Sequence, residues 1–170
     1  MRLLHSIGDR KFGSNFNQIS EILAAQEANE KLSFDGIYTS VFEHREQLKG
    51  RGHVLFFMGN FVGGDNSFDV GQPLQQYCNW KQLLELVSGY GFELGFHTHS
   101  HLDLTLLKDE AQIRYEMTPP FPVKKIAYPY GKVDDRIARI AEEIGYEEGY
   151  CAGHHGDNSR FERRRQYLNW

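Results

Sequence analysis

Short apolar runs alternate with amphipathic segments along most of the chain. The run His53-Val54-Leu55-Phe56-Phe57-Met58 is apolar after its first residue, which is typical of a strand buried on both faces. Most runs are bounded by glycine, proline, asparagine or aspartate, the residues that favour turns. Strands are therefore predicted at residues 32–36, 53–58, 92–96, 123–127 and 148–152.

Between these runs, apolar residues recur every three or four positions, as they do on one face of a helix. Asn79 has the residue type of a helix N-cap, and Gly145 has that of a C-terminal stop. Residues 1–14 are expected to form an irregular lead-in. Residues 59–77 form a long connection, and a connection of this length is more often functional than idle. Helices are predicted at residues 15–29, 38–49, 79–89, 106–117 and 134–144.

The alternation of strands and helices favours a mainly parallel sheet with helices outside it, which is an α/β fold. The 170 residues fit a single domain, 1–170. A formal net charge of −4 argues against nucleic acid or an anionic membrane as the partner. The segment from Met1 to Ser6 lacks the long apolar core of a signal peptide, and no segment approaches a membrane span. A cytoplasmic location is therefore expected.

The sequence also contains one basic run and two cysteines, and neither indicates a binding site. The run Arg163-Arg164-Arg165 lies close to the C-terminus and is interpreted as a solvated face of the tail. Cys78 and Cys151 are far apart and do not form a Cys-x-x-Cys motif, so neither a disulfide framework nor a thiolate metal site is indicated. Cys151 lies in a predicted strand and is expected to be a buried thiol.

Polar groups follow several of the predicted strands. In a parallel α/β fold the carboxyl ends of the strands converge on one face, and that face carries the functional site. This reasoning brings together the residues at five strand ends. They are Asp35, Gly59-Asn60, His97 to His101, Tyr128 to Tyr130, and His154-His155.

The segment from Gly95 to His101 holds three of the eight histidines. His97 and His101 are four residues apart, so on one turn of helix both imidazoles would leave the same face. Imidazole is a common zinc ligand, and two histidines with Asp35 would leave positions open for water and substrate. The alternatives are a polar loop with chance histidines, and a turn-forming aspartate before Gly36.

The segments Leu32 to Asp35, Asn79-Trp80, Glu93 to Leu104 and Ala127 to Gly131 appear in that order, and together they make the chain resemble a known family. The sequence is similar to the polysaccharide deacetylase (NodB-homology, carbohydrate esterase) family over about residues 30–155. The resemblance implies an incomplete, distorted (β/α) barrel that removes acetyl groups from N- or O-acetylated carbohydrate. It also implies a divalent metal, preferably zinc, with cobalt or nickel as alternatives.

The resemblance also assigns roles to residues. His97, Thr98 and His101 match the family's His-[Ser/Thr]-x-x-His pattern, so the two histidines are expected to bind the metal. The residues Tyr128, Pro129 and Tyr130 are expected to line the substrate groove. The family's late histidine, a general acid, has no clear counterpart, and His154 or His155 could take that role, although a polar surface loop explains them about as well.

The first motif departs from the family pattern Thr-Phe-Asp-Asp-Gly, in which the first aspartate is the base and the second binds metal. Without a gap, Asp35 matches the base and Gly36 replaces the metal ligand. With a one-residue deletion, Asp35 would be the metal ligand and the base would be missing. The ungapped register is favoured because more neighbours match. In the third motif, Ala127 stands where an arginine is often found.

The replacement of the metal-binding aspartate by Gly36 allows a second function. A family member without its metal carboxylate could bind a glycan or metal without hydrolysing anything. Another metal hydrolase, acting on a different amide or ester, is a third reading of the same residues.

Overall fold

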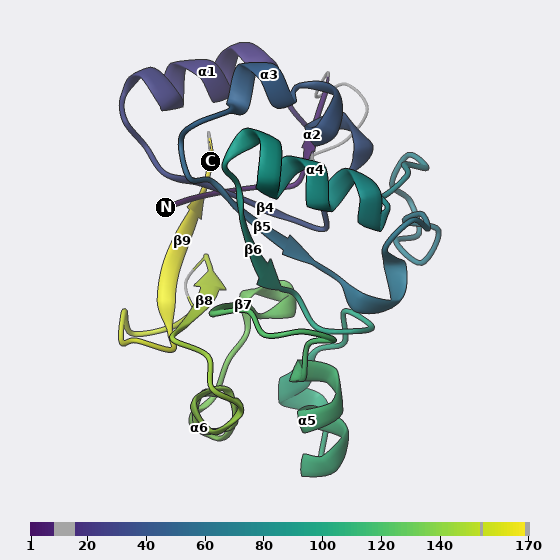
Figure 1. The fold of residues 1–170 in the computed structure, drawn as a ribbon. Coiled ribbons are helices and arrows are strands. Elements are labelled where there is room, and N and C mark those ends of the chain that lie inside the picture. The colour runs from purple at the N-terminus through teal and green to yellow at the C-terminus, as the bar shows by residue number, and fades with distance from the viewer. Residues whose placement is uncertain (9–15, 154, 169–170) are drawn as a thin grey trace.

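The computed structural model describes residues 1–8, 16–153 and 155–168. In this part of the chain, seven parallel strands close into a barrel in the order β1-β4-β5-β6-β7-β8-β9, and β9 pairs with β1 to complete it. This confirms the predicted barrel of parallel strands (Figure 1). The strands are β1 (Arg2–Leu4), β4 (Leu32–Asp35), β5 (Val54–Phe57), β6 (Glu93–Phe96), β7 (Lys125–Ala127), β8 (Glu148–Ala152) and β9 (Arg163–Tyr167).

The helices surround the barrel, with α1 to α4 on one side and α5 and α6 on the other (Figure 1). The segment predicted as one helix over 38–49 is two short helices, and a small separate sheet pairs β2 (Ser6–Ile7) with β3 (Phe16–Asn17). The helices are α1 (Ile19–Glu27), α2 (Thr39–Glu43), α3 (Arg45–Leu48), α4 (Trp80–Tyr90), α5 (Glu110–Met117) and α6 (Asp135–Ile144), with 3-10 turns η2 (Gly59–Phe61), η3 (Leu104–Leu106) and η4 (Pro129–Gly131).

Local sequence explains the ends of α4. The Asn79 side chain accepts a hydrogen bond from the backbone N–H of Gln82, and the Gln82 side chain accepts one from the backbone of Asn79. These reciprocal bonds satisfy donors that a helix start otherwise leaves free. At the other end, Gly91 has a φ of 73°, a left-handed conformation that glycine adopts without steric cost.

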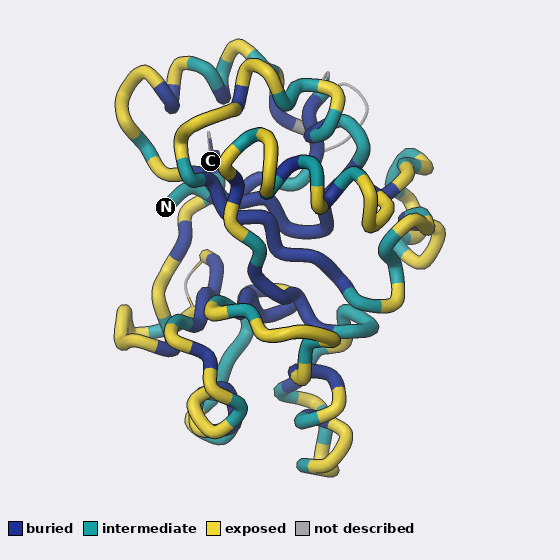
Figure 2. The backbone as a smooth tube through the Cα atoms, in the orientation of Figure 1, coloured by how far each residue is buried: buried dark blue, intermediate teal, exposed yellow. Residues whose placement is uncertain are grey.

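The barrel strands separate two sets of apolar side chains. In β5, Leu55 and Phe57 belong to the large core shared with the helices, whereas Val54 and Phe56 belong to a smaller cluster with Ala127 and Tyr150. Alternate residues of a barrel strand face outward and inward, so the smaller cluster fills the barrel interior. The strands accordingly form a buried centre beneath exposed helix faces (Figure 2).

A glycine makes room for one of these interior rings. A Cβ atom on Gly95 would lie 2.5 Å from Cε1 of Phe56, closer than real side-chain contacts. Gly95 therefore allows the Phe56 ring to occupy the barrel interior beside β6.

Two predictions about the chain ends are wrong. The described part of residues 1–14 contains β1 and β2 in place of an irregular lead-in, while residues 9–15 lie outside the described residues. The run Arg163 to Arg165 opens a barrel strand, in which Arg163 and Arg164 are exposed but Arg165 is 1% exposed. β1 is only three residues long and β9 carries four polar residues and one tyrosine, and the two strands pair with each other from opposite ends of the chain, which local patterns do not reveal.

Two further expectations concern the cysteines and membranes. Cys78 and Cys151 are both buried and free. None of the described helices is long and apolar enough to cross a membrane.

Candidate active site

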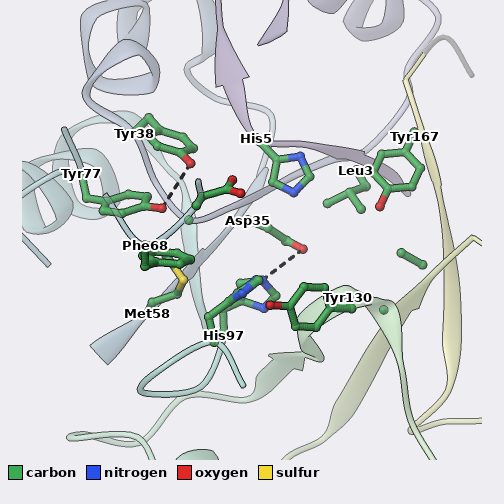
Figure 3. A pocket seen from close by; sticks show the side chains of 15 residues that line it. Leu3, His5, Asp35, Tyr38, Met58, Phe68, Tyr77, His97, Tyr130 and Tyr167 are labelled. Carbon is green, nitrogen blue, oxygen red and sulfur yellow. Dashed lines mark hydrogen bonds and ion pairs between the residues drawn. The ribbon is translucent and has the colours of Figure 1, made fainter. Parts of the chain in front are cut away.

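A cavity of about 240 Å³ opens at the carboxyl ends of the barrel strands (Figure 3). The structure brings four of the predicted site residues to it: Asp35, His97, His101 and Tyr130. Asp35 ends β4 and the other three follow β6 or β7, so the convergence of strand ends places them together, as the parallel arrangement requires. The remaining lining residues are Leu3, His5, Gly36, Tyr38, Met58, Phe68, Asp69, Tyr77, Gly131, Ala152 and Tyr167.

Asp35 ends β4 and is 4% exposed. Two nitrogens of the Arg165 guanidinium donate to its two carboxylate oxygens, at 2.6 and 2.7 Å. Burial alone would raise the pKa of Asp35, but the charge of Arg165, assisted by His97, outweighs it and lowers the pKa to about 2. The carboxylate is therefore ionised at neutral pH.

His97 faces Asp35 with one nitrogen and the β7 backbone with the other. Its Nδ1 lies 2.8 Å from the carbonyl oxygen of Ala127, and its Nε2 lies 3.7 Å from Oδ2 of Asp35 (Figure 3). A carbonyl only accepts, so the neutral ring carries its proton on Nδ1 and a lone pair on Nε2. Burial lowers the pKa of His97, which favours this neutral form. Two acceptors therefore face one another across the 3.7 Å gap.

His101 reaches the same place through a bent loop, which corrects the helical-turn reading of the His97–His101 pair. Thr98 and His101 both have left-handed backbones, with φ of 66° and 56°, and the N–H of His101 donates to Oγ1 of Thr98 at 3.1 Å. The His97 and His101 rings are 4.9 Å apart. Non-glycine residues in this conformation are uncommon and concentrate at functional sites.

The environment of the His101 ring favours its neutral form and leaves one ring nitrogen without a hydrogen bond. Burial, followed by the neighbouring His97, lowers the pKa of His101 to about 3. Its Nδ1 is buried and has no hydrogen-bond partner among the described residues. His99 points elsewhere: its Nε2 donates to the carbonyl oxygen of Thr118, and its ring stacks on Tyr115.

The predicted substrate-binding triplet divides into one pocket residue and two buried ones. Tyr130 is 58% exposed and its ring lies 4.9 Å from that of His101. Tyr128 is fully buried in the large core, and Pro129 is buried behind the pocket wall. Of the two late histidines, His154 lies outside the described residues, and His155 is exposed and does not line the cavity.

Sequence reasoning missed the side of the pocket built by the chain ends. His5 follows β1 and Tyr167 ends β9, and their rings stack with centroids 6.2 Å apart. Burial lowers the pKa of His5 to about 4. The long 59–77 connection, expected to be functional, contributes Phe68, Asp69 and Tyr77. A polar residue directly after Leu3-Leu4 was the available signal for His5, because it marks a strand end.

The donor chemistry of this site fits a divalent cation. The imidazoles of His97 and His101 are neutral, Asp35 is ionised, and the facing acceptors and the unpartnered Nδ1 of His101 would each be satisfied by a cation. The set is short of ligands, however. Within the described ranges, no three or more His, Cys, Asp or Glu side chains are arranged to hold a metal ion.

Position 36, where the family pattern has a second carboxylate, is a glycine with tightly packed surroundings. Its φ is 61°, and a Cβ there would lie 3.1 Å from Cε1 of Tyr77 and 3.2 Å from Cε of Met58. Those two side chains occupy the space next to position 36. Asp35, His97 and His101 remain the predicted ligands, and His5 and Asp69 also line the cavity.

Comparison with known proteins identifies the class of barrel and then the family. The structure is similar to IcaB from Ammonifex degensii (17% identity, TM-score 0.73, covering 98% of this chain and 88% of that one). It is also similar to the Streptococcus pyogenes deacetylase PplD in complex with acetate (16%, TM-score 0.69, covering 98% and 91%). A third similar structure is the deacetylase domain of BpsB from Bordetella bronchiseptica. Its sequence identity is 13% and its TM-score 0.71, and the match covers 98% of this chain and 95% of that one. These likenesses establish the fold.

The family follows from the sequence match. Residues 53–149 match the polysaccharide deacetylase family, and the chain belongs to that family. No curated protein matches the chain. The matched range contains His97, His101 and Tyr130, whereas Asp35 and Arg165 lie outside it.

Proposed function

We propose that this protein is a metal-dependent hydrolase that removes acetyl groups from an N- or O-acetylated carbohydrate. The observation that carries the proposal is the pair of facing acceptors, Nε2 of His97 and Oδ2 of Asp35, beside the unpartnered His101 at the strand ends of a deacetylase-family barrel. His97 and His101, with Asp35 as the nearest carboxylate, would hold the ion. Zinc is the preferred ion, and cobalt or nickel are alternatives.

When bound, such an ion polarises a carbonyl and lowers the pKa of water. The residues of the chain supply the rest. The Ala127 carbonyl keeps His97 in the tautomer whose Nε2 faces the cavity, and Arg165 keeps Asp35 ionised so that it can accept a proton. Tyr130, which is exposed beside the cavity, would contact the sugar or the acyl oxygen. His154 remains the predicted proton donor, and a cytoplasmic location remains a prediction.

The decisive test measures acetate release. Protein purified without chelator is assayed for metal content and then incubated with N-acetylglucosamine oligomers and with acetylated xylan, adding zinc, cobalt or nickel. We expect release that depends on metal and is lost in Asp35→Asn. Glu142→Gln, a change at an exposed carboxylate on α6, is the matched control. Absence of turnover with every metal would refute the proposal.

Two observations favour a second candidate, a member that binds glycan or metal without hydrolysis. Tyr77 and Met58 fill the space beside Gly36, and Arg165 offsets the charge of Asp35. Both reduce the attraction for a cation. Saturable binding of the same oligomers, measured by calorimetry, without acetate release would support this candidate.

A further inference from the structure

The loop that carries His97 and His101 has a strained backbone. Thr98 and His101 are both left-handed, with φ of 66° and 56°, and non-glycine residues keep this conformation only where their surroundings hold it. The bond from the N–H of His101 to the Thr98 hydroxyl lies within the loop and does not tie it to the rest of the barrel. Neighbouring elements must therefore fix the loop in place.

The 3-10 turn η2 holds one side of the loop. The N–H of Gly59 donates to the carbonyl oxygen of Thr98 at 3.0 Å. The N–H of Asn60 donates to the carbonyl oxygen of His99, also at 3.0 Å, and the Asn60 side chain donates to Oγ of Ser100 at 2.9 Å. These bonds occupy acceptors of the loop, so its N–H groups need acceptors from elsewhere.

Glu116, on α5, holds the other side through two consecutive N–H groups. Its carbonyl oxygen accepts from the N–H of His99 at 3.1 Å, and Oε2 of its side chain accepts from the N–H of Ser100 at 2.8 Å. Glu116 is 3% exposed, and a buried carboxyl group requires such a partner. The side-chain bond therefore grips the backbone one residue before His101.

The third histidine of the segment joins the same two elements. Nε2 of His99 donates to the carbonyl oxygen of Thr118, two residues after Glu116, at 2.8 Å. On the other side of the ring, a Cβ atom on Gly59 would collide with Nδ1 of His99. His99 thus lies between the end of α5 and η2, where it anchors the loop from the side opposite to the cavity.

We infer that Glu116 is a positioning residue of this site, and that its side chain fixes the loop so that the His97 and His101 rings meet with centroids 4.9 Å apart. This role rests on the proposed function, because the two rings are the predicted metal ligands. Glu116 does not line the cavity in the described chain, so it acts through the loop and not on the substrate. A loop that is ordered before the metal binds does not have to be ordered by it, which favours binding.

The first measurement is zinc affinity, obtained by competition with a chelator, with the absorption spectrum of bound cobalt as a report on ligand geometry. For Glu116→Ala we expect the affinity to fall by about 10- to 100-fold, as for loss of an outer-shell partner. Glu116→Gln keeps an oxygen acceptor at the same reach and should remain close to wild type. Glu116→Asp keeps the carboxyl group but is one methylene shorter, so it should resemble Glu116→Ala. Gln112→Ala, at an exposed position of α5, is the control.

Hydrogen exchange of the metal-free protein gives a second readout. The Ser100 amide should exchange faster in Glu116→Ala and Glu116→Asp than in wild type and Glu116→Gln, because it loses its acceptor. A role confined to the packing of α5 would not produce this order among the variants. Circular dichroism establishes which variants fold, and if Glu116→Ala does not fold, Glu116→Asp and Glu116→Gln carry the comparison.

The outcomes distinguish this role from the proposed function. A folded Glu116→Ala or Glu116→Asp with wild-type zinc affinity, or with wild-type exchange of the Ser100 amide, overturns the positioning role and leaves the deacetylase function in place. A loss of affinity in Glu116→Gln as large as in Glu116→Ala also overturns it, because the reach of the acceptor would then not matter. Wild-type protein that binds metal but releases no acetate overturns the proposed function alone. Wild-type protein that binds none of the three metals overturns both.

Discussion

The two sides of the pocket come from different parts of the sequence: one from recognisable motifs at the ends of central strands, the other from the strands at the two ends of the chain. The motif side carries Asp35 at the end of β4, His97 and His101 in the loop after β6, and Tyr130 in the loop after β7. The closing side consists of β1 and β9, which contribute His5 and Tyr167 to the cavity and Arg165 behind it. In the proposed function, the motif side holds the groups that act on the substrate, and Arg165 on the closing side pairs with one of them, Asp35. The two sides face one cavity only because the pairing of β1 with β9 closes the barrel.

The largest expected effect breaks the link between the two sides. Arg165→Met leaves the Asp35 carboxylate buried without its partner, and removing one member of a buried ion pair costs about 3–5 kcal/mol. The unfolding free energy from urea titration should fall by about that amount. The double variant Arg165→Met with Asp35→Asn should recover part of it, because no isolated charge remains. Arg163→Gln should stay within about 0.5 kcal/mol of wild type.

The ion pair between Asp35 and Arg165 was not predicted from the sequence. The strands β4 to β8 and the start of α4 followed from apolar runs and from Asn79, which are local signals. The pairing of Arg2 with Gln166 joins residues from opposite ends of the chain, and no local pattern encodes it. An arginine-rich strand also resembles a solvated surface unless its partner is known.

The His97–His101 segment was predicted for its chemistry but not for its shape. The two rings meet because Thr98 and His101 adopt left-handed backbones supported by the Thr98 hydroxyl. The four-residue spacing indicated proximity through a helical turn, a different geometry with the same outcome. Tyr128 and Pro129 show the reverse case, because their motif was visible but burial separates them from Tyr130.

The second prediction concerns the chemistry of the motif side alone. Asp35→Asn removes the ionised acceptor while keeping its shape, so kcat for acetate release should fall by at least about 100-fold, as for loss of a general base. The variant should bind the oligomers with nearly unchanged affinity, measured by calorimetry. Equal rates for Asp35→Asn and wild type would remove Asp35 from the mechanism, whichever register of the first motif is correct.

A third prediction concerns His53, a buried histidine that belongs to neither side of the pocket. His53 precedes β5, and burial, with Arg51 and Lys31 nearby, lowers its pKa to about 4. The unfolded chain then binds one more proton than the folded chain between about pH 6.5 and 4, so stability falls as pH decreases through that window. His53→Asn, which keeps an acceptor near Nδ1, should remove up to about 1.4 kcal/mol per pH unit from that slope.

The activity of His53→Asn separates stability from the site. Acetate release at neutral pH should match wild type, because His53 does not line the cavity in the described structure. A slope identical to that of wild type between pH 6.5 and 4 would show that His53 is not held neutral in the folded protein. A loss of neutral-pH activity would show that the site is sensitive to changes at the opposite end of the barrel.

The smallest expected effect concerns the rim of the motif side. Tyr130→Ala removes an exposed ring at the rim beside His101, which we expect to contact the sugar. Loss of one aromatic contact with the substrate is worth about 0.5–1.5 kcal/mol, or about 2- to 10-fold in KM for the oligomers. Tyr115→Ala is the matched control, because Tyr115 is similarly exposed and stacks on His99, the histidine of the same segment that faces away. Tyr130→Phe separates ring from hydroxyl: a wild-type KM with reduced kcat would place the hydroxyl at the acyl oxygen. If Tyr130→Ala and Tyr115→Ala change KM equally, the effect comes from packing of the segment, and Tyr130 has no direct contact with the sugar.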